Sequence, residues 1–135
     1  MIEQQSGQVV RLADVPGRDD LEGHPGVNAH SFARPGVGCR WLHVTLNVIE
    51  ENGGIERHYH EGLDADHAYY VIDGELLAWI GDQEHRVGPD SLIIFPCATV
   101  HGFKVVSPGG AKVLRLGAAD NGATSGGSVF VSPGG

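Results

Sequence analysis

Gly54-Ile55-Glu56-Arg57-His58-Tyr59-His60 is the segment from which the fold and function of this 135-residue chain can be inferred. His58 and His60 stand one residue apart, and in an extended strand residues i and i+2 point to the same face. Two adjacent imidazoles can supply two ligands to a transition metal, and further ligands from elsewhere would complete the site. The pair alone also fits two exposed strand histidines or a pH-sensitive patch.

The sequence around this segment consists of short apolar runs separated by turn residues. Glycine (21 residues) and proline (7 residues) fall mostly between the runs. Residues 40–49 alternate, with apolar side chains from Leu42 to Val48 on one face and His43, Thr45 and Asn47 on the other. No segment has a helical period of useful length. Strands are expected at 9–15, 27–32, 40–49, 68–72, 75–80, 84–87, 92–95, 101–106, 111–116 and 128–132.

Turns separate these strands at short intervals. Residues 16–26 form a loop, residues 50–54 and 81–82 form turns, and Asp73-Gly74 predicts a hairpin between its flanking strands. Many short strands with frequent turns are typical of an all-β sandwich or barrel. We expect a single domain with a barrel core at about 27–117, an N-terminal arm at 1–26 and a flexible tail at 118–135.

Composition and charge exclude several classes of partner. The net charge of −8 argues against nucleic acid and against an anionic membrane, because both require a basic surface. Cys39 and Cys97 are too few for a disulfide scaffold, and we interpret them as free thiols. The sequence shows no signal peptide and no apolar stretch of roughly 20 residues. The expected location is the cytoplasm.

Two further histidines belong to the same pattern. His67 begins the strand that carries Tyr69, and His101 begins the strand that carries Phe103. All four histidines, with His58 and His60 opening their own strand, would head apolar faces that line the interior of a small barrel. Converging imidazoles in an apolar pocket suit a metal that keeps open positions for a substrate or water.

The spacing of these residues resembles the two-motif signature of the cupins. Its parts are Gly54-x3-His58-x-His60, then His67-x6-Gly74, then Gly88-x7-Pro96-x4-His101, within residues 40–116. The resemblance implies an antiparallel jelly-roll β-barrel with a metal in its mouth. The family's ligand set is two histidines and a glutamate from the first motif and a histidine from the second. This set maps onto His58, His60, His67 and His101.

Three features depart from the usual cupin pattern. His67 stands where the family has glutamate, which points to the subset of single-domain cupins with four histidines. The loop before His67 is longer than usual and contains Glu61, Asp64 and Asp66 as rival ligands, supporting groups or acceptors of a substrate proton. Ala98 replaces a glycine that usually follows the motif proline.

A site of four neutral imidazoles would leave the full charge of a divalent metal in place. Such a metal is a strong Lewis acid that can polarise a carbonyl or bind an enolate. Fe, Mn, Ni, Cu and Zn are the expected occupants, because imidazole does not suit Mg or Ca. Tyr69 and Phe103 would line the substrate pocket, with Tyr69 also a catalytic candidate beside Glu61 and Asp64. His43 is either an acid–base group of the pocket or an ordinary strand histidine.

The resemblance implies a metal-dependent enzyme that acts on a small organic molecule. A dioxygenase acting on a diketone, enolate or catechol-like substrate is the first expectation. The alternative is a non-redox polyketide cyclase, isomerase or lyase, and the third possibility is a cupin that binds a small ligand without catalysis. The resemblance also implies a homodimer formed by exchange of terminal strands, for which residues 9–15 would serve.

Overall fold

The computed structural model describes residues 7–61, 65–119 and 128–131, and all but one of their elements are β-strands. The exception is a short 3₁₀ helix, η1 (Leu12–Asp14). The strands are β1 (Gly17–Arg18), β2 (Val27–Pro35), β3 (Gly38–Cys39), β4 (Leu42–Ile49), β5 (Gly54–His60), β6 (Ala65–Asp73), β7 (Leu76–Ile80), β8 (Gln83–Val87), β9 (Ser91–Pro96), β10 (His101–Val105), β11 (Ala111–Ala119) and β12 (Ser128–Phe130).

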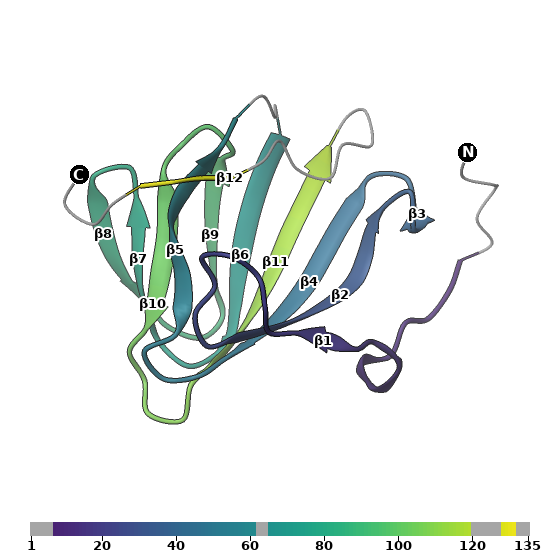
Figure 1. Ribbon diagram of the computed structural model, residues 1–135, viewed down its shortest axis with the longest axis horizontal. Helices are drawn as coiled ribbons and strands as arrows, with labels where there is room; N and C mark the ends of the chain where they lie inside the picture. Colours follow the sequence, from purple (N-terminus) through teal and green to yellow (C-terminus); the bar gives the residue numbers. More distant parts are fainter. Residues whose placement is uncertain (1–6, 62–64, 120–127, 132–135) are drawn as a thin grey trace.

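The strands form two sheets that enclose one interior (Figure 1). One sheet has seven strands in the order β1-β2-β4-β11-β6-β9, with β3 added to β2. The other has five strands in the order β12-β5-β10-β7-β8. Every pairing is antiparallel except that of β2 with β3. This arrangement confirms the predicted all-β, jelly-roll fold.

The core lies between the inner faces of the two sheets. Alternation along β6 and β11 turns Tyr69, Val71 and Val113 inward, where they are buried. The five-stranded sheet contributes Leu76, Ala78, Phe103 and Val105 to the same cluster. Aromatic rings fill the end nearest the histidines, since Tyr69 lies 5.2 Å from Phe95 and 5.1 Å from Phe103 between ring centroids.

The turn at Asp73-Gly74 joins the two sheets, and the predicted hairpin is wrong. β6 pairs with β11 and β9, whereas β7 pairs with β10 and β8, so the turn carries the chain from one sheet to the other. Gly74 has a φ of 91°, and a Cβ there would lie 2.6 Å from the carbonyl oxygen of Gly110. The close approach of a second turn therefore requires glycine at this position of the motif.

The N-terminal segment is not the predicted strand. Residues 9–15 contain η1 and no strand, and in Figure 1 they lie beyond β1, at the edge of the seven-stranded sheet. Val9 is 76% exposed. Apolar alternation gives a strand only where a sheet edge supplies hydrogen-bond partners, and here the neighbouring edge is taken by β1. Strand β1 itself lies inside the predicted loop at 16–26, and β3 was not predicted.

Other strands match their predicted positions with shifted ends. β2, β6 and β11 are each longer than expected, and β11 includes residues 118 and 119 of the predicted tail. The rest of that tail lies outside the described residues, apart from β12 and residue 131. His58 and His60 end β5 rather than open it. Cys39 and Cys97 are thiols and not a disulfide, as predicted. No helix among the described residues is long and apolar enough to cross a membrane.

Candidate metal centre

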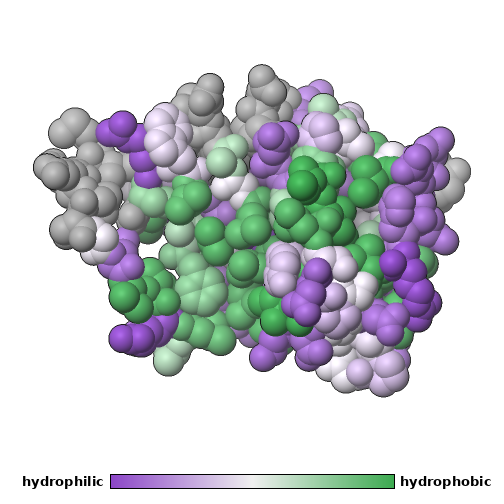
Figure 2. All heavy atoms as spheres, turned by 180° about the vertical axis from the view of Figure 1, so that it is seen from behind, coloured by the Kyte–Doolittle hydropathy of each residue, from purple (hydrophilic) through white to green (hydrophobic). Residues whose placement is uncertain are grey.

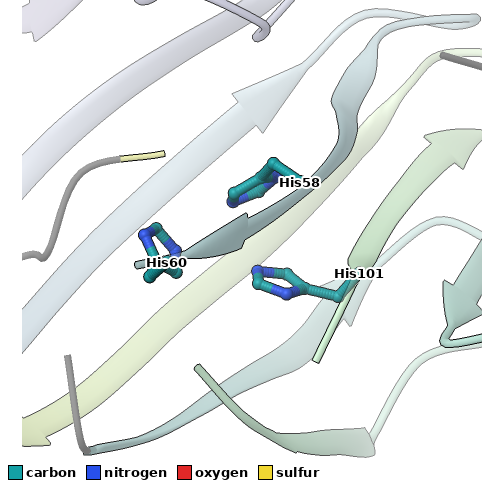
Figure 3. A group of neighbouring side chains, drawn as sticks. All are labelled: His58, His60 and His101. Atoms are coloured by element: carbon teal, nitrogen blue, oxygen red, sulfur yellow. The ribbon is translucent and has the colours of Figure 1, made fainter. Parts of the chain in front are cut away.

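Three histidines from two neighbouring strands converge inside the barrel. His58 and His60 come from the end of β5, and His101, at the start of β10, is paired with His58 in the register of the two strands. One ring nitrogen from each lies within 4.8 Å of the others. Figure 3 shows the three rings gathered around a common space. All three side chains are buried.

Backbone carbonyls set the orientation of two of these rings. The Nδ1 atoms of His58 and His101 lie 2.7 Å from the carbonyl oxygens of Glu56 and Thr99. A carbonyl oxygen only accepts hydrogen bonds, so Nδ1 carries the proton in both rings and donates it. Nε2 is therefore the nitrogen with a free lone pair. Histidine ligands in metal sites are commonly held in this way.

The second ring nitrogen of His101 is the observation that tests the fit to a metal. His101 Nε2 is buried and has no hydrogen-bond partner among the residues that the structure describes. A buried acceptor without a partner is destabilising, and a metal ion would satisfy it. Three imidazole nitrogens suit a divalent transition metal and leave coordination positions open for other ligands. The residues present therefore fit the metal that the sequence predicted.

Burial keeps these imidazoles in the form that binds metals. Desolvation lowers the pKa of His101 to about 3, although its hydrogen bond to Thr99 opposes the shift. Desolvation also lowers the pKa of His58. Both rings are neutral at neutral pH, so metal binding does not have to displace a proton from either.

His67 approaches this group from the other sheet. It is buried on β6, and its ring centroid lies 5.1 Å from that of His60. It is nevertheless not among the residues whose ligand atoms lie within 4.8 Å of one another. Desolvation, and then the charge of Arg115, lower the pKa of His67 to about 3.

Arg115 is a residue of the site that the sequence interpretation missed. It lies on β11, paired with Thr45 on one side and Tyr69 on the other. Its Nη2 lies 3.2 Å from the ring nitrogens of His67, and its Nη1 contacts His43. The sequence feature that could have identified it is the alternation along β11, which puts Arg115 on the same face as buried Val113.

His67 cannot accept a hydrogen bond from Arg115 and coordinate a metal at the same time. A neutral imidazole has one nitrogen that donates and one that accepts. If the guanidinium donates to the accepting nitrogen of His67, no lone pair remains for a metal. The structure shows His67 with Arg115, so the fourth ligand position stays a prediction that requires Arg115 to release this ring.

The predicted pocket residues lie on the inner faces near the histidines. Tyr69 and Phe103 are buried, and the Tyr69 ring centroid is 6.3 Å from that of His101. Desolvation raises the pKa of Tyr69 to about 12, so the phenol keeps its proton and can act as a donor at neutral pH. His43 is half-buried, and desolvation, followed by the charge of Arg115, lowers its pKa to about 4.

The acidic loop contributes no described carboxylate to the three-histidine group. Glu61 and Asp66 are both exposed. Neither is among the residues that the structure brings together as potential metal ligands. Asp64 lies outside the described residues.

Comparison with solved structures shows the same fold. The chain is similar to KdgF from Halomonas sp., with a TM-score of 0.71 and 19% identity, covering 86% of this chain and 96% of that one. It is also similar to the polyketide cyclase RemF from Streptomyces resistomycificus, with a TM-score of 0.71 and 23% identity, covering 93% and 87% of the two chains. A mutant of oxalate decarboxylase OxdC from Bacillus subtilis matches with a TM-score of 0.69 and 21% identity, covering 94% of this chain and 34% of that one.

Comparison at the level of sequence gives one positive result. No curated protein matches the chain. The family model described as "Cupin domain" matches residues 45–117, which is more than half of the chain and includes all four histidines of the two motifs. The protein therefore belongs to the cupin family.

Proposed function

We propose that this cupin is a metal-dependent enzyme that acts on a small oxygen-containing organic molecule between the two sheets. The convergence of His58, His60 and His101 carries the proposal, together with Nε2 of His101, which is buried without a partner among the described residues. A bound Fe, Mn, Ni, Cu or Zn ion would supply Lewis-acid chemistry toward a substrate oxygen, or redox chemistry if the metal is redox-active.

The residues around the three histidines would position the substrate and exclude water. Phe95 stacks on His101 with ring centroids 3.9 Å apart, and Phe103 packs against Tyr69. Neutral Tyr69 would donate a hydrogen bond to a substrate oxygen, because its raised pKa makes it unsuited to act as a base. Glu61 or Asp64 would take up a substrate proton if the acidic loop approaches the site.

A dioxygenase is the first reaction class that we propose. The three-imidazole donor set would suit iron and would leave room for more than one further ligand. A diketone, an enolate or a catechol-like molecule offers two oxygens and would fit such a site. The aromatic rings beside the histidines would suit a flat substrate.

A non-redox cyclase, isomerase or lyase is the second reaction class. The observation that favours it is the similarity to a polyketide cyclase, RemF, over 93% of this chain. All donors in the group are neutral, so the full positive charge of a metal would remain available to stabilise an anionic oxygen. Stabilising an anionic oxygen does not require the metal to change its oxidation state.

Elemental analysis of protein purified without a histidine tag, together with oxygen uptake, tests the proposal. Near-stoichiometric iron and oxygen uptake with acetylacetone as the diketone probe would support the dioxygenase. A tightly held zinc ion without oxygen uptake would support the non-redox class. A metal that can be removed without effect on ligand binding would point to a non-enzymatic binding protein. Absence of metal after reconstitution with each of the five ions would contradict both enzyme proposals.

We also propose a homodimer, built on surfaces other than the strand exchange expected from the sequence. The outer face of the seven-stranded sheet exposes Leu42, Ile72, Leu92 and Ile94, and the N-terminal segment exposes Val9, Val10 and Leu12. Figure 2 shows hydrophobic side chains gathered over the face opposite to that of Figure 1. Exposed apolar surfaces of this kind mark interfaces, and two copies could cover each other's.

Sedimentation equilibrium should then give twice the chain mass of 14.3 kDa. Ile94→Lys should give the monomer mass, because it places a charge in the apolar face. Gln83→Lys, which adds the same charge at an exposed position of β8, should leave the dimer intact. A monomeric wild-type protein would rule the dimer out.

A further inference from the structure

We propose that Arg115 is an anion-binding residue that recognises a carboxylate group of the substrate from the sheet opposite the metal ligands. The inference deepens the proposed function and rests on it for the identity of the bound molecule as a substrate. It narrows the substrate class to small carboxylates that carry a further oxygen-containing group, such as oxo- or hydroxy-acids.

The first argument is the charge of the site. Arg115 is a cation that points into the barrel, and burial lowers its pKa from the ordinary value without removing the proton. The ion pairs among the described residues join Arg18 to Asp20 and Arg86 to Glu75, both on the surface. Within those residues, Arg115 forms hydrogen bonds with the rings of His43 and His67 and no ion pair with a carboxylate. A half-buried cation without a carboxylate partner is less stable than a paired one, so an anionic ligand would be favoured.

The second argument is the geometry of the guanidinium. His43 and His67 hold its two terminal nitrogens, and each neutral ring accepts one hydrogen bond. Guanidinium has five N–H donors in a planar fork, so N–H groups remain for a ligand. The fork matches a carboxylate, which it can bind through two parallel hydrogen bonds.

Gly117 makes room for this arrangement. It follows Arg115 on the same face of β11 and is paired with His67 on β6 and His43 on β4. A Cβ at Gly117 would lie 3.0 Å from Cδ2 and 3.3 Å from Nε2 of the His67 ring. A larger residue would displace the ring that helps to hold the guanidinium. The absent side chain leaves the space between the two histidines to Arg115.

The third argument is the position of Arg115 relative to the metal ligands. His58, His60 and His101 belong to the five-stranded sheet, whereas Arg115 belongs to the seven-stranded sheet. His60 and His67 lie 5.1 Å apart between ring centroids, so the two sheets approach closely at this level. A small molecule between them could present its carboxylate to Arg115 and a further oxygen to a metal ion that the three histidines would hold.

Thermal unfolding of the metal-free protein with benzoate as the probe tests the proposal apart from the metal. At constant ionic strength, benzoate should raise the unfolding temperature of the wild type, and neutral benzamide should not. Arg115→Gln should bind benzoate roughly ten- to hundredfold more weakly, because a charge-assisted pair is lost. Arg115→Lys keeps the positive charge without the planar guanidinium. Its affinity for benzoate should lie between those of the wild type and Arg115→Gln.

Arg86→Gln is the matched control, since it removes one positive charge from the exposed strand β8 and should bind benzoate as the wild type does. Equal benzoate binding by the wild type and both Arg115 variants would overturn the inference, as would equal binding of benzamide. If Arg115→Gln does not fold, the comparison of Arg115→Lys with the wild type decides. Benzoate binding that depends on Arg115 in a protein that never takes up metal would uphold the anion site while the proposed enzyme fails. Metal uptake without Arg115-dependent benzoate binding would contradict the anion site and leave the proposed enzyme standing.

Discussion

His101→Ala is expected to weaken metal binding at least about 100-fold, because the loss of a residue that merely supports a ligand already costs 10- to 100-fold. His101 supplies a buried ring nitrogen that has no partner among the described residues, and it lies opposite His58 in the register of β5 and β10. The variant leaves two imidazoles of the group in place. Competition of the metal-free protein against a chelator of known affinity, at neutral pH, measures the change.

His85→Ala is the control, since His85 is an exposed histidine whose ring contacts Gln83. It should bind metal as the wild type does. His67→Ala separates a three-ligand site from a four-ligand site. A small loss would mean that His67 serves mainly Arg115, whereas a loss as large as that of His101→Ala would mean that it coordinates the metal. Wild-type affinity in His101→Ala would contradict the proposed centre.

Phe95→Ala is expected to lower the free energy of unfolding by about 3–5 kcal/mol, the usual cost of removing a buried aromatic side chain. Phe95 is 1% exposed and packs against the rings of Tyr69 and His101. The substitution leaves a cavity between the core and the metal ligands. Urea denaturation of the metal-free protein measures the loss without a contribution from bound metal.

The neighbouring residue provides the matched control. Ile94 lies on the same strand with its side chain on the outer face, 63% exposed. At a protein concentration low enough to dissociate the proposed dimer, Ile94→Ala should therefore change the free energy of unfolding by less than about 1 kcal/mol, the range of substitutions away from the core. Equal losses in the two variants would show that β9 does not have distinct inward and outward faces. Because Phe95 stacks on His101, Phe95→Ala should also weaken metal binding, although less than His101→Ala does.

The sequence predicted the strand content well because its signals are local. Alternation of two residues set the inward face of β6 and β10, and glycine and proline marked most of the turns. It failed at residues 9–15, where the apolar pattern is present and the sheet edge is not. A strand needs a partner for its backbone groups, and the pattern of one segment carries no information about that partner.

The same contrast between local signals and distant partners separates the histidines of the site from Arg115. The spacing of His58 and His60 placed two imidazoles on one face, and the motif spacing of the cupins added His67 and His101. Alternation along β11 puts Arg115 on the inward face, but its partners, His43 and His67, are 72 and 48 residues away along the chain. No short-range pattern reports such contacts.

The sequence alone determined that this chain is all-β, that it carries the cupin motifs and which histidines lie on inward faces, because strand periodicity and motif spacing are properties of neighbouring residues. The tertiary structure decided which sheet each strand joins. It also brought His101 opposite His58 and placed a guanidinium between His43 and His67. These features depend on antiparallel pairings between distant segments, which form only when the two sheets close around a common core.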